Sequence, residues 1–212
     1  MKRKIAFVCN PLSGTNNKAV FEKIIQEEMA AASIPFEFLN TDPQRNYSVL
    51  EKRILHDEIT DVVIVGGDGT INSVAAALRH TPARFGIVPA GSGNGLALAA
   101  GISTDIRRAV KIIVDGYSSR IDAFTINNRF SCMLSGIGFD AKVAQQFAEN
   151  GKRGLQTYFK IILKNFFSAS PFPFKVHFHS KHLATEAYFI SIANSNQFGN
   201  QFTIAPKAKL ND

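Results

Sequence analysis

Two glycine-rich turns, each placed between a strand-like run and a helix-like run, constrain the fold of this chain more than any other feature. The first, GGDGT at residues 66–70, follows the β-branched run DVVIV and precedes an apolar stretch at 71–78. The second, PAGSGNG at residues 89–95, lies between FGIV and LALAA. Short β-branched runs that end in glycine are typical of strands buried on both faces of a parallel sheet. The pair therefore predicts two strand–turn–helix units in one α/β sheet.

Both turns have the chemistry of an anion site. Glycine lets the backbone approach a ligand closely, and the free amides at a helix N-terminus attract phosphate. We expect Thr70 to cap the helix at 71–78, and Ser92 and Asn94 to add a hydroxyl and an amide to the pocket. Asp68 would repel a phosphate, so we expect it to organise Mg²⁺ or its bound waters. Either turn alone is more often structural, but the pair with an acid and two hydroxyls predicts phosphate handling.

Strand-like and helix-like runs alternate as far as residue 119. The expected strands are 5–9, 36–39, 61–65 and 85–88, and the other expected helices begin at 17, 49 and 104. This alternation predicts an α/β fold with a parallel sheet and right-handed crossovers over residues 1–119. Together with the phosphate chemistry of the two turns, it makes residues 1–119 a candidate Rossmann-like nucleotide-binding domain.

Beyond residue 120 the pattern changes to paired strands, which predicts a second, β-rich domain at residues 120–212. This domain is the candidate to hold the molecule that accepts a phosphate. Runs at 122–126 and 129–135 flank Asn127 and Asn128, a pair typical of a hairpin turn. Runs at 174–179 and 185–193 are expected to pair around residues 180–182. The cleft between the two domains is the expected site.

Composition limits the class of protein. The formal net charge of +7 suits phosphate-bearing partners, but it does not choose among nucleotide, nucleic acid and anionic membrane. The sequence has no secretory signal and no apolar run long enough for a membrane span. Cys9 and Cys132 lie in apolar runs without metal-ligand spacing. We therefore expect a cytoplasmic protein, with peripheral contact at the inner membrane face left open by the apolar, lysine-bearing helix after Gly154.

The motifs resemble those of the diacylglycerol kinase catalytic domain superfamily, which includes bacterial lipid kinases and sphingosine kinases. Residues 10–14 (NPLSG) resemble its first nucleotide loop, GGDGTIN its signature and PAGSGNGLA its third loop. The resemblance continues through residues 120–122, 136–141 and 204–210, and so covers the whole chain. Many bacterial members carry Asp where this chain has Gly95, which is closer to the sphingosine kinase form.

The resemblance implies a set of site residues. It implies ATP and Mg²⁺ as cofactors, with Asp68 as the catalytic acid that arranges the metal together with Asp122, Asp212 and the carbonyl of Leu210. The residues implied to contact the nucleotide are Asn10, Ser13, Gly14, Thr41, Gly66, Gly67, Gly69, Thr70, Ile71, Asn72 and Ser92. Family members usually continue for about another half-domain, on ordinary domain sizes. We therefore expect the second domain to be incomplete at its C-terminus, with the catalytic base beyond residue 212.

Three functions stay open at this point. The first is an ATP-dependent kinase that phosphorylates a hydroxyl of a diacylglycerol-like or sphingoid-like lipid at the membrane surface, with no nucleic-acid partner and a homodimer left open. The second is a soluble-acceptor kinase, because NAD kinases resemble this fold and also carry GGDG. The third is a non-catalytic nucleotide- or lipid-binding relative. A Rossmann oxidoreductase is disfavoured, because no Gly-x-Gly-x-x-Gly motif opens the first helix.

Overall fold

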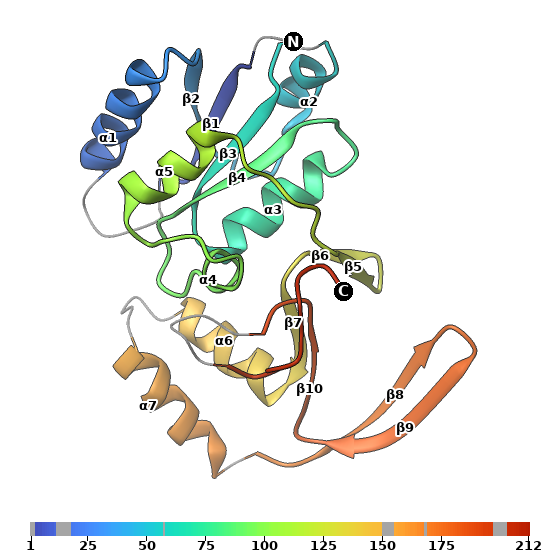
Figure 1. The fold of residues 1–212 in the computed structure, drawn as a ribbon. Coiled ribbons are helices and arrows are strands. Elements are labelled where there is room, and N and C mark those ends of the chain that lie inside the picture. The colour runs from blue at the N-terminus through green and yellow to red at the C-terminus, as the bar shows by residue number, and fades with distance from the viewer. Residues whose placement is uncertain (1–2, 12–17, 57, 150–154, 168, 197–202) are drawn as a thin grey trace. The chain divides into compact units, whose positions relative to one another are not determined.

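The computed structural model describes residues 3–11, 18–56, 58–149, 155–167, 169–196 and 203–212 (Figure 1). The chain divides into two compact units, one of residues 1–133 and 194–212 and one of residues 134–193. The sequence placed the boundary at residues 119/120, whereas residues 120–133 belong to the first compact unit, to which the chain also returns after residue 193.

A four-stranded parallel sheet forms the centre of the first unit, as predicted. Its strand order is β2-β1-β3-β4. Residue Ile5 pairs with Phe36 on one side and with Asp61 on the other, and Asp61 pairs with Arg84. The strands are β1 (Ile5–Cys9), β2 (Phe36–Asn40), β3 (Asp61–Gly66) and β4 (Arg84–Pro89).

Helices bury both faces of this sheet, which is why its central strands are almost wholly apolar. On one face, Phe7 packs with Ile25 of α1 (Lys18–Ala31) and with Val110 of α5 (Ile106–Asp115). On the other face, Val8 packs with side chains of α2 (Ser48–Leu55) and α3 (Asp68–Leu78). Alternate residues of β1 thus serve two separate cores, as the period of two along a strand requires.

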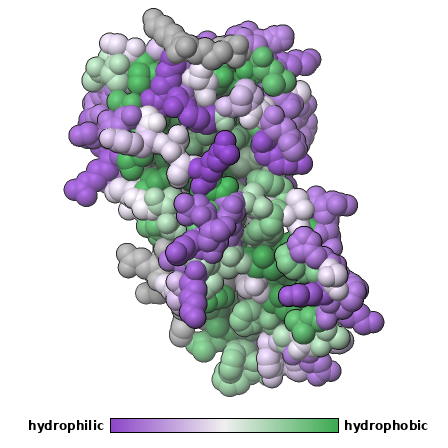
Figure 2. All heavy atoms as spheres, turned by 45° about the vertical axis from the view of Figure 1, so that its right-hand side comes forward, coloured by the Kyte–Doolittle hydropathy of each residue, from purple (hydrophilic) through white to green (hydrophobic). Residues whose placement is uncertain are grey.

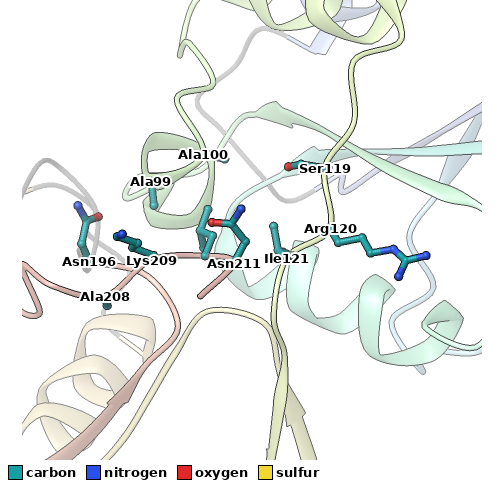
Figure 3. A pocket seen from close by; sticks show the side chains of 10 residues that line it. Ala99, Ala100, Ser119, Arg120, Ile121, Asn196, Ala208, Lys209 and Asn211 are labelled. Atoms are coloured by element: carbon teal, nitrogen blue, oxygen red, sulfur yellow. The ribbon is translucent and has the colours of Figure 1, made fainter.

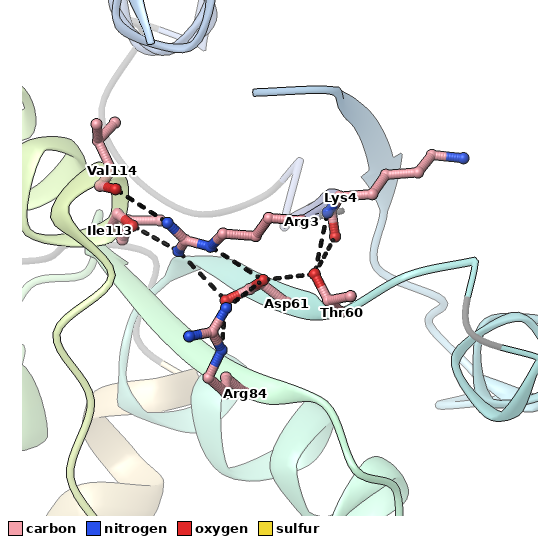
Figure 4. Close-up of polar contacts among 7 residues, drawn as sticks. All are labelled: Arg3, Lys4, Thr60, Asp61, Arg84, Ile113 and Val114. Carbon is pink, nitrogen blue, oxygen red and sulfur yellow. Dashed lines mark hydrogen bonds and ion pairs between the residues drawn. The ribbon is translucent and has the colours of Figure 1, made fainter. Parts of the chain in front are cut away.

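A buried carboxylate holds the amino ends of the strands together (Figure 4). Asp61 forms ion pairs with Arg3 (3.2 Å) and Arg84 (3.0 Å), and it accepts a hydrogen bond from the Thr60 hydroxyl at 2.7 Å. Arg3 also donates to the carbonyls of Ile113 and Val114 at the end of α5. An open space of about 390 Å³ lies beside these two arginines. Because both guanidinium groups pair with Asp61, we assign a structural role to this edge of the sheet.

Local signals end several elements where they were expected. The short helix α4 (Gly95–Ala99) is followed by Gly101 with a φ of +72°, a left-handed conformation that suits glycine. Asn127 and Asn128, with φ of 48° and 63°, form the two-residue turn between β5 (Phe124–Ile126) and β6 (Arg129–Ser131). This confirms the predicted hairpin, although its second strand ends at Ser131 and not at residue 135.

The second unit contains two antiparallel strand pairs and two helices. Strand β7 (Leu134–Gly138) pairs with β10 (Phe189–Ala193), and β8 (Phe172–Phe178) pairs with β9 (Lys181–Ala187). The helices between them are α6 (Phe139–Glu149) and α7 (Leu155–Phe166). On the face shown in Figure 2, apolar side chains reach the surface over this unit. No helix among the described residues combines the length and apolar character needed to cross a membrane.

Two expectations for this unit were wrong. The β8–β9 turn is His179–Ser180, because Phe178 pairs directly with Lys181. The expected single strand at 185–193 is two strands, β9 and β10, with separate partners. Tyr188 stands between them, and its carbonyl accepts a hydrogen bond from the Phe139 amide at 2.8 Å. These pairings join residues far apart in the chain, so local alternation does not reveal them.

Candidate functional site

Several of the expected nucleotide residues gather at the carboxyl edge of the parallel sheet. Asn10 follows β1, Thr41 follows β2, and Gly67 and Gly91 follow β3 and β4. The chain leaves β1 toward β2 on one side, whereas β3 and β4 extend the sheet on the other. Between β1 and β3 the strand order therefore reverses, and ligands of open α/β sheets bind at such a point.

The two glycine-rich turns meet backbone to backbone. A Cβ atom added at Gly91 would lie 2.4 Å from the Cα of Gly67, and one added at Gly67 would lie 3.0 Å from the Cα of Gly91. The amide of Ala90 also donates to the carbonyl of Gly66 at 3.0 Å. The structure thus confirms that the two turns are adjacent, and it shows why Gly91 tolerates no side chain.

Asp68 joins the two turns through its carboxylate. One oxygen accepts from the amide of Gly95 at 2.9 Å and the other from the amide of Leu96 at 3.1 Å. The acid therefore satisfies the free amides at the start of α4, where negative charge is stabilised. This role was not expected from the sequence, and it means that the N-terminus of α4 is already filled by an anion.

The start of α3 remains open for a second anion. Gly67 is the N-cap and supplies no side chain, and its carbonyl accepts from the amides of Thr70 and Ile71. The amides of Asp68 and Gly69 have no acceptor within the described ranges. Two backbone donors at a helix N-terminus are suited to a phosphate. The side chain of Ile71 is buried in the core, so only its backbone belongs to this turn.

The predicted helix cap at Thr70 was wrong. Helix α3 begins at Asp68, three residues earlier than expected, and the Thr70 hydroxyl accepts a hydrogen bond from the Asn10 side-chain amide at 2.9 Å. The Asn10 backbone amide donates to Val65, and the Thr41 amide donates to Cys9. These contacts draw the ends of β1, β2 and β3 together at one place. Ser13 and Gly14, expected in the same loop, lie outside the described residues.

Asn94 holds the second turn in shape, a role that was not expected from the sequence. Its side-chain oxygen accepts from the Gly91 amide and its side-chain nitrogen donates to the Gly91 carbonyl, both at 2.9 Å. The residue is buried and has a left-handed φ of 52°, which Asn tolerates better than most residues. Ser92 is exposed at the tip of the same turn.

Asn72 also has a structural partner. Its side-chain nitrogen donates to the Phe130 carbonyl at 3.1 Å, and its oxygen accepts from the Cys132 amide at 3.2 Å. The side chain thus holds the β5–β6 hairpin against α3.

Burial raises the pKa of Cys132 to about 11, and the nearby charge of Asp68 acts in the same direction. Cys132 is therefore a neutral core thiol and no nucleophile.

The expected metal residues are brought together only in part. The amide of Asp122 donates to the Leu210 carbonyl at 2.7 Å, and the Asp122 carbonyl accepts from Asn194 at 2.6 Å. Asp122 and Asp212 are exposed, and no group of three or more His, Cys, Asp or Glu gathers in the described part of the chain. Mg²⁺ usually keeps several waters and takes one or two carboxylates. The described acids fit a Mg²⁺ ion bound by one or two carboxylates and several waters. They do not fit an ion bound by protein ligands alone.

A pocket of about 330 Å³ lies beside the hydrogen bond between Asp122 and Leu210, and Leu210 itself lines it (Figure 3). It is lined by the end of α4, by residues 119–121 and 208–211, and by Asn196. In Figure 3 the Arg120 side chain extends away from it, whereas Lys209 lies on the side of Asn196. No local sequence pattern points to this pocket, since its walls come from four segments that are distant in the chain.

Comparison with known proteins identifies the family. Residues 4–126 match the family model described as diacylglycerol kinase catalytic domain, and residues 134–212 match one described as YegS C-terminal NAD kinase beta sandwich-like domain. The chain therefore belongs to the diacylglycerol kinase catalytic domain family.

The relatives are distant and longer. The diacylglycerol kinase of Staphylococcus carnosus is 28% identical over 69% of this chain and 48% of its own length. That of Staphylococcus epidermidis strain RP62A is 23% identical over the whole chain and 68% of its own length. A crystal structure described as a diacylglycerol kinase of Bacillus anthracis has a TM-score of 0.77 at 20% identity, and covers 99% of this chain and 72% of its own. The chain thus spans about half the length of the first of these relatives.

Proposed function

We propose that this chain is the nucleotide-binding part of an ATP-dependent lipid kinase, which transfers the γ-phosphate to a hydroxyl of a diacylglycerol-like or sphingoid-like lipid. The observation that carries the proposal is the contact of Gly67 with Gly91 at the reversal of strand order. At the same edge, the amides of Asp68 and Gly69 at the start of α3 have no acceptor among the described residues and would be available to a phosphate. The relatives from Staphylococcus carnosus and Staphylococcus epidermidis, both diacylglycerol kinases, support the same class of reaction.

The residues divide the work in the manner that phosphoryl transfer requires, which is chiefly positioning and charge stabilisation. Amides of Asp68 and Gly69 would hold phosphate, while Asn10, Thr41 and Thr70 would line the nucleotide side. Ser92 would close the pocket at its mouth. The expected nucleotide contact of Asn72 would compete with its bonds to Phe130 and Cys132.

A metal would act through water. Bound Mg²⁺ would neutralise charge on the transferred phosphate. Asp68 keeps one lone pair on each oxygen after accepting from Gly95 and Leu96, so it can still orient a metal-bound water. Asp122, beside the Leu210 carbonyl, is the second acid of this set. Asp212 remains a proposed ligand.

The acceptor is proposed to be a lipid presented at the inner face of the cell membrane. The support is the diacylglycerol kinase family to which the chain belongs, together with the basic, partly apolar second unit. Nucleic acid is not proposed as a partner, and a homodimer remains open. A soluble acceptor is the second candidate, because the family model that matches residues 134–212 is described as NAD kinase beta sandwich-like.

The test is transfer from labelled ATP with Mg²⁺ into a bacterial lipid extract supplemented with NAD, followed by solvent partitioning. Asp68→Ala should abolish transfer, since it removes both the α4 cap and the acid. Asp105→Ala is the matched control, because Asp105 caps α5 by accepting from the Arg108 amide. Loss of a helix cap alone should lower the free energy of unfolding by about 1 kcal/mol in either variant.

The outcomes separate the candidates. Label in the organic phase that Asp68→Ala removes and Asp105→Ala retains would support the lipid kinase. Label confined to NADP in the aqueous phase would favour the soluble acceptor. Binding of ATP without transfer to either would favour a non-catalytic relative, and full transfer by a folded Asp68→Ala variant would refute the role of Asp68.

A further inference from the structure

The β8–β9 hairpin places two histidines directly opposite each other. His177 of β8 pairs with His182 of β9, one pair away from the end of the hairpin. Residues opposite each other in an antiparallel pair project from the same face, so their side chains can meet. The two imidazole rings are in edge contact, with centroids 4.6 Å apart, and their Nδ1 atoms are 2.7 Å apart. Two nitrogen atoms that can each ligate a metal ion therefore converge at one point.

The distance between the two Nδ1 atoms matches a particular coordination geometry. An imidazole nitrogen lies about 2.0–2.1 Å from a bound divalent transition metal. Two such ligands at right angles about the ion are then about 2.8–3.0 Å apart, whereas in a tetrahedron they are about 3.3–3.4 Å apart. The observed 2.7 Å is closer to the first arrangement. It corresponds to adjacent positions of a square-planar or octahedral ion, and tetragonal sites with nitrogen ligands favour Cu²⁺ and Ni²⁺.

The same distance is also compatible with a hydrogen bond between the rings. A neutral imidazole has one N–H and one free lone pair, so one Nδ1 could donate to the other. Metal binding instead requires a lone pair on both Nδ1 atoms, with the proton of each ring on Nε2. No proton can lie between the rings while an ion does. The two states are therefore mutually exclusive, and metal binding distinguishes them.

The histidine pair lies on the polar face of the hairpin, and both residues are exposed. Lys175 and Glu186 are on the same face by register and are diagonal neighbours, so their opposite charges offset each other. The family model that matches this region is described as beta sandwich-like. In a sandwich the apolar face of each sheet packs on the facing sheet, and the polar face meets solvent. The pair is therefore expected to stay accessible however the apolar face is covered.

We propose that His177 and His182 form a surface chelate for a divalent late-transition-metal ion, with Cu²⁺ and Ni²⁺ as the favoured ions. Water completes the coordination, because no third His, Cys, Asp or Glu joins the pair among the residues that the structure describes. The site is separate from the proposed magnesium site, since Mg²⁺ prefers oxygen ligands. The inference goes beyond the proposed kinase activity and does not depend on it.

A bound ion would connect the two strands of the hairpin. A two-stranded hairpin is marginally stable in water on its own, and the described neighbours leave most of this one exposed. An ion that binds only when the two histidines lie side by side stabilises the paired state by mass action. The chemical role of the site is thus a reversible cross-link close to the turn of the hairpin.

Calorimetric titration with NiCl₂ tests the site without any catalysis. The chain is used without a polyhistidine tag, in a buffer that contains Mg²⁺ to occupy oxygen-ligand sites. The wild type should bind Ni²⁺, and His177→Gln and His182→Gln should each weaken this binding about tenfold or more. The reason is that the second ligand of a chelate acts at a high effective concentration, which each variant removes. With Cu²⁺, electron paramagnetic resonance should show nitrogen coupling from two imidazoles in the wild type and from one in each variant.

His179→Asn is the matched control. His179 is an exposed histidine of the same hairpin, but its ring contacts the Phe178 ring and is not part of the pair. Its φ is 52°, a left-handed conformation that Asn also adopts readily, so the turn should be kept. Binding of Ni²⁺ by this variant should equal that of the wild type. Circular dichroism of each variant verifies the fold.

Three results would overturn the proposal. They are absence of Ni²⁺ and Cu²⁺ binding by the wild type, wild-type binding by both His177→Gln and His182→Gln, and an equal loss in His179→Asn. The first would leave the ring contact as a hydrogen bond, and the others would place the ion elsewhere. Phosphoryl transfer is measured separately with Mg²⁺ alone, so its failure leaves the metal-binding result intact.

Discussion

The two units of this protein bury their apolar side chains in different ways. The first places a parallel sheet between two helical layers, so β1 and most of β3 are inaccessible to solvent on both faces. In the second unit, Val143 and Ile161 are buried, but few other described apolar side chains are. Its β8–β9 hairpin exposes an apolar face. The first unit is therefore stabilised within itself, whereas the described residues of the second leave more apolar surface exposed.

The comparison teaches where a rigid site can be built. The glycine turns lie on strands whose positions are fixed by two cores and by the Asp61 ion pairs at the opposite edge. Close backbone approaches such as that of Gly67 and Gly91 require this support, because a sub-ångström shift would separate or overlap them.

The sharpest test of the comparison is truncation of one apolar residue in each unit. Ile64→Ala removes a fully buried side chain of β3 and should lower the free energy of unfolding by about 2–5 kcal/mol. Leu183→Ala in the hairpin should change it by no more than about 0.5 kcal/mol, because the side chain is already exposed. Urea unfolding measures both. Similar losses would show that the hairpin face is covered.

Removal of the Asp61 carboxylate should break the amino edge of the first unit. Asp61→Ala leaves Arg3 and Arg84 without their acid and should cost about 2–4 kcal/mol, a range reduced for the partial exposure of both arginines. Glu27→Gln is the control, since its pair with Arg107 is exposed and worth little. Thermal unfolding of the two variants should therefore differ widely, and equal midpoints would refute a structural role for the Asp61 cluster.

Two glycines of the site should respond in opposite directions. Gly91→Ala places a methyl group against the Gly67 backbone, and should destabilise by about 1–3 kcal/mol while separating the turns. Gly69→Ala meets nothing within 4 Å in α3, so it should be neutral or stabilise by about 0.4–1 kcal/mol. ATP binding, measured by calorimetry alongside denaturant unfolding, should fall for Gly91→Ala because the two turns separate. A tolerated Gly91→Ala would mean that the turns are not in contact.

The smallest expected effect is the pH response of Cys132. Its pKa in the folded protein is raised from 9.0 to about 11, chiefly by burial, so the folded state favours the neutral thiol. The unfolded chain releases this proton first as pH rises, and stability should decrease between pH 9 and 11. Cys132→Ala should remove that part of the decrease, seen as a smaller difference between unfolding free energies at the two pH values. Identical pH profiles would contradict the raised pKa.

Local sequence patterns were sufficient for much of the first unit. The β-branched run before Gly66, the glycine at 101 and the paired asparagines at 127 and 128 each have a mechanism that acts over a few residues. The same patterns placed Asn10, Thr41 and the two glycine turns at the ends of strands. Because the ends of parallel strands share one edge, the gathering of these residues followed from the fold class.

Local patterns were insufficient where a side chain has two possible partners. Asp68, Asn72 and Asn94 were all expected to face a ligand, but each bonds to backbone of the protein itself. In the second unit the pairing of β7 with β10 joins strands more than fifty residues apart. A strand shows in its sequence which residues share a face, but not which strand will lie beside it.

The sequence by itself determined the alternation of strands and helices in the first unit, the positions of its glycine turns and its family, because propensity, turn chemistry and motif spacing are local properties. Only the tertiary structure decided that Asp68 caps α4, that Gly67 and Gly91 touch, and that the β8–β9 hairpin leaves one apolar face open. These depend on which distant groups satisfy each amide and cover each apolar surface, and that choice is made by the packing of the whole chain.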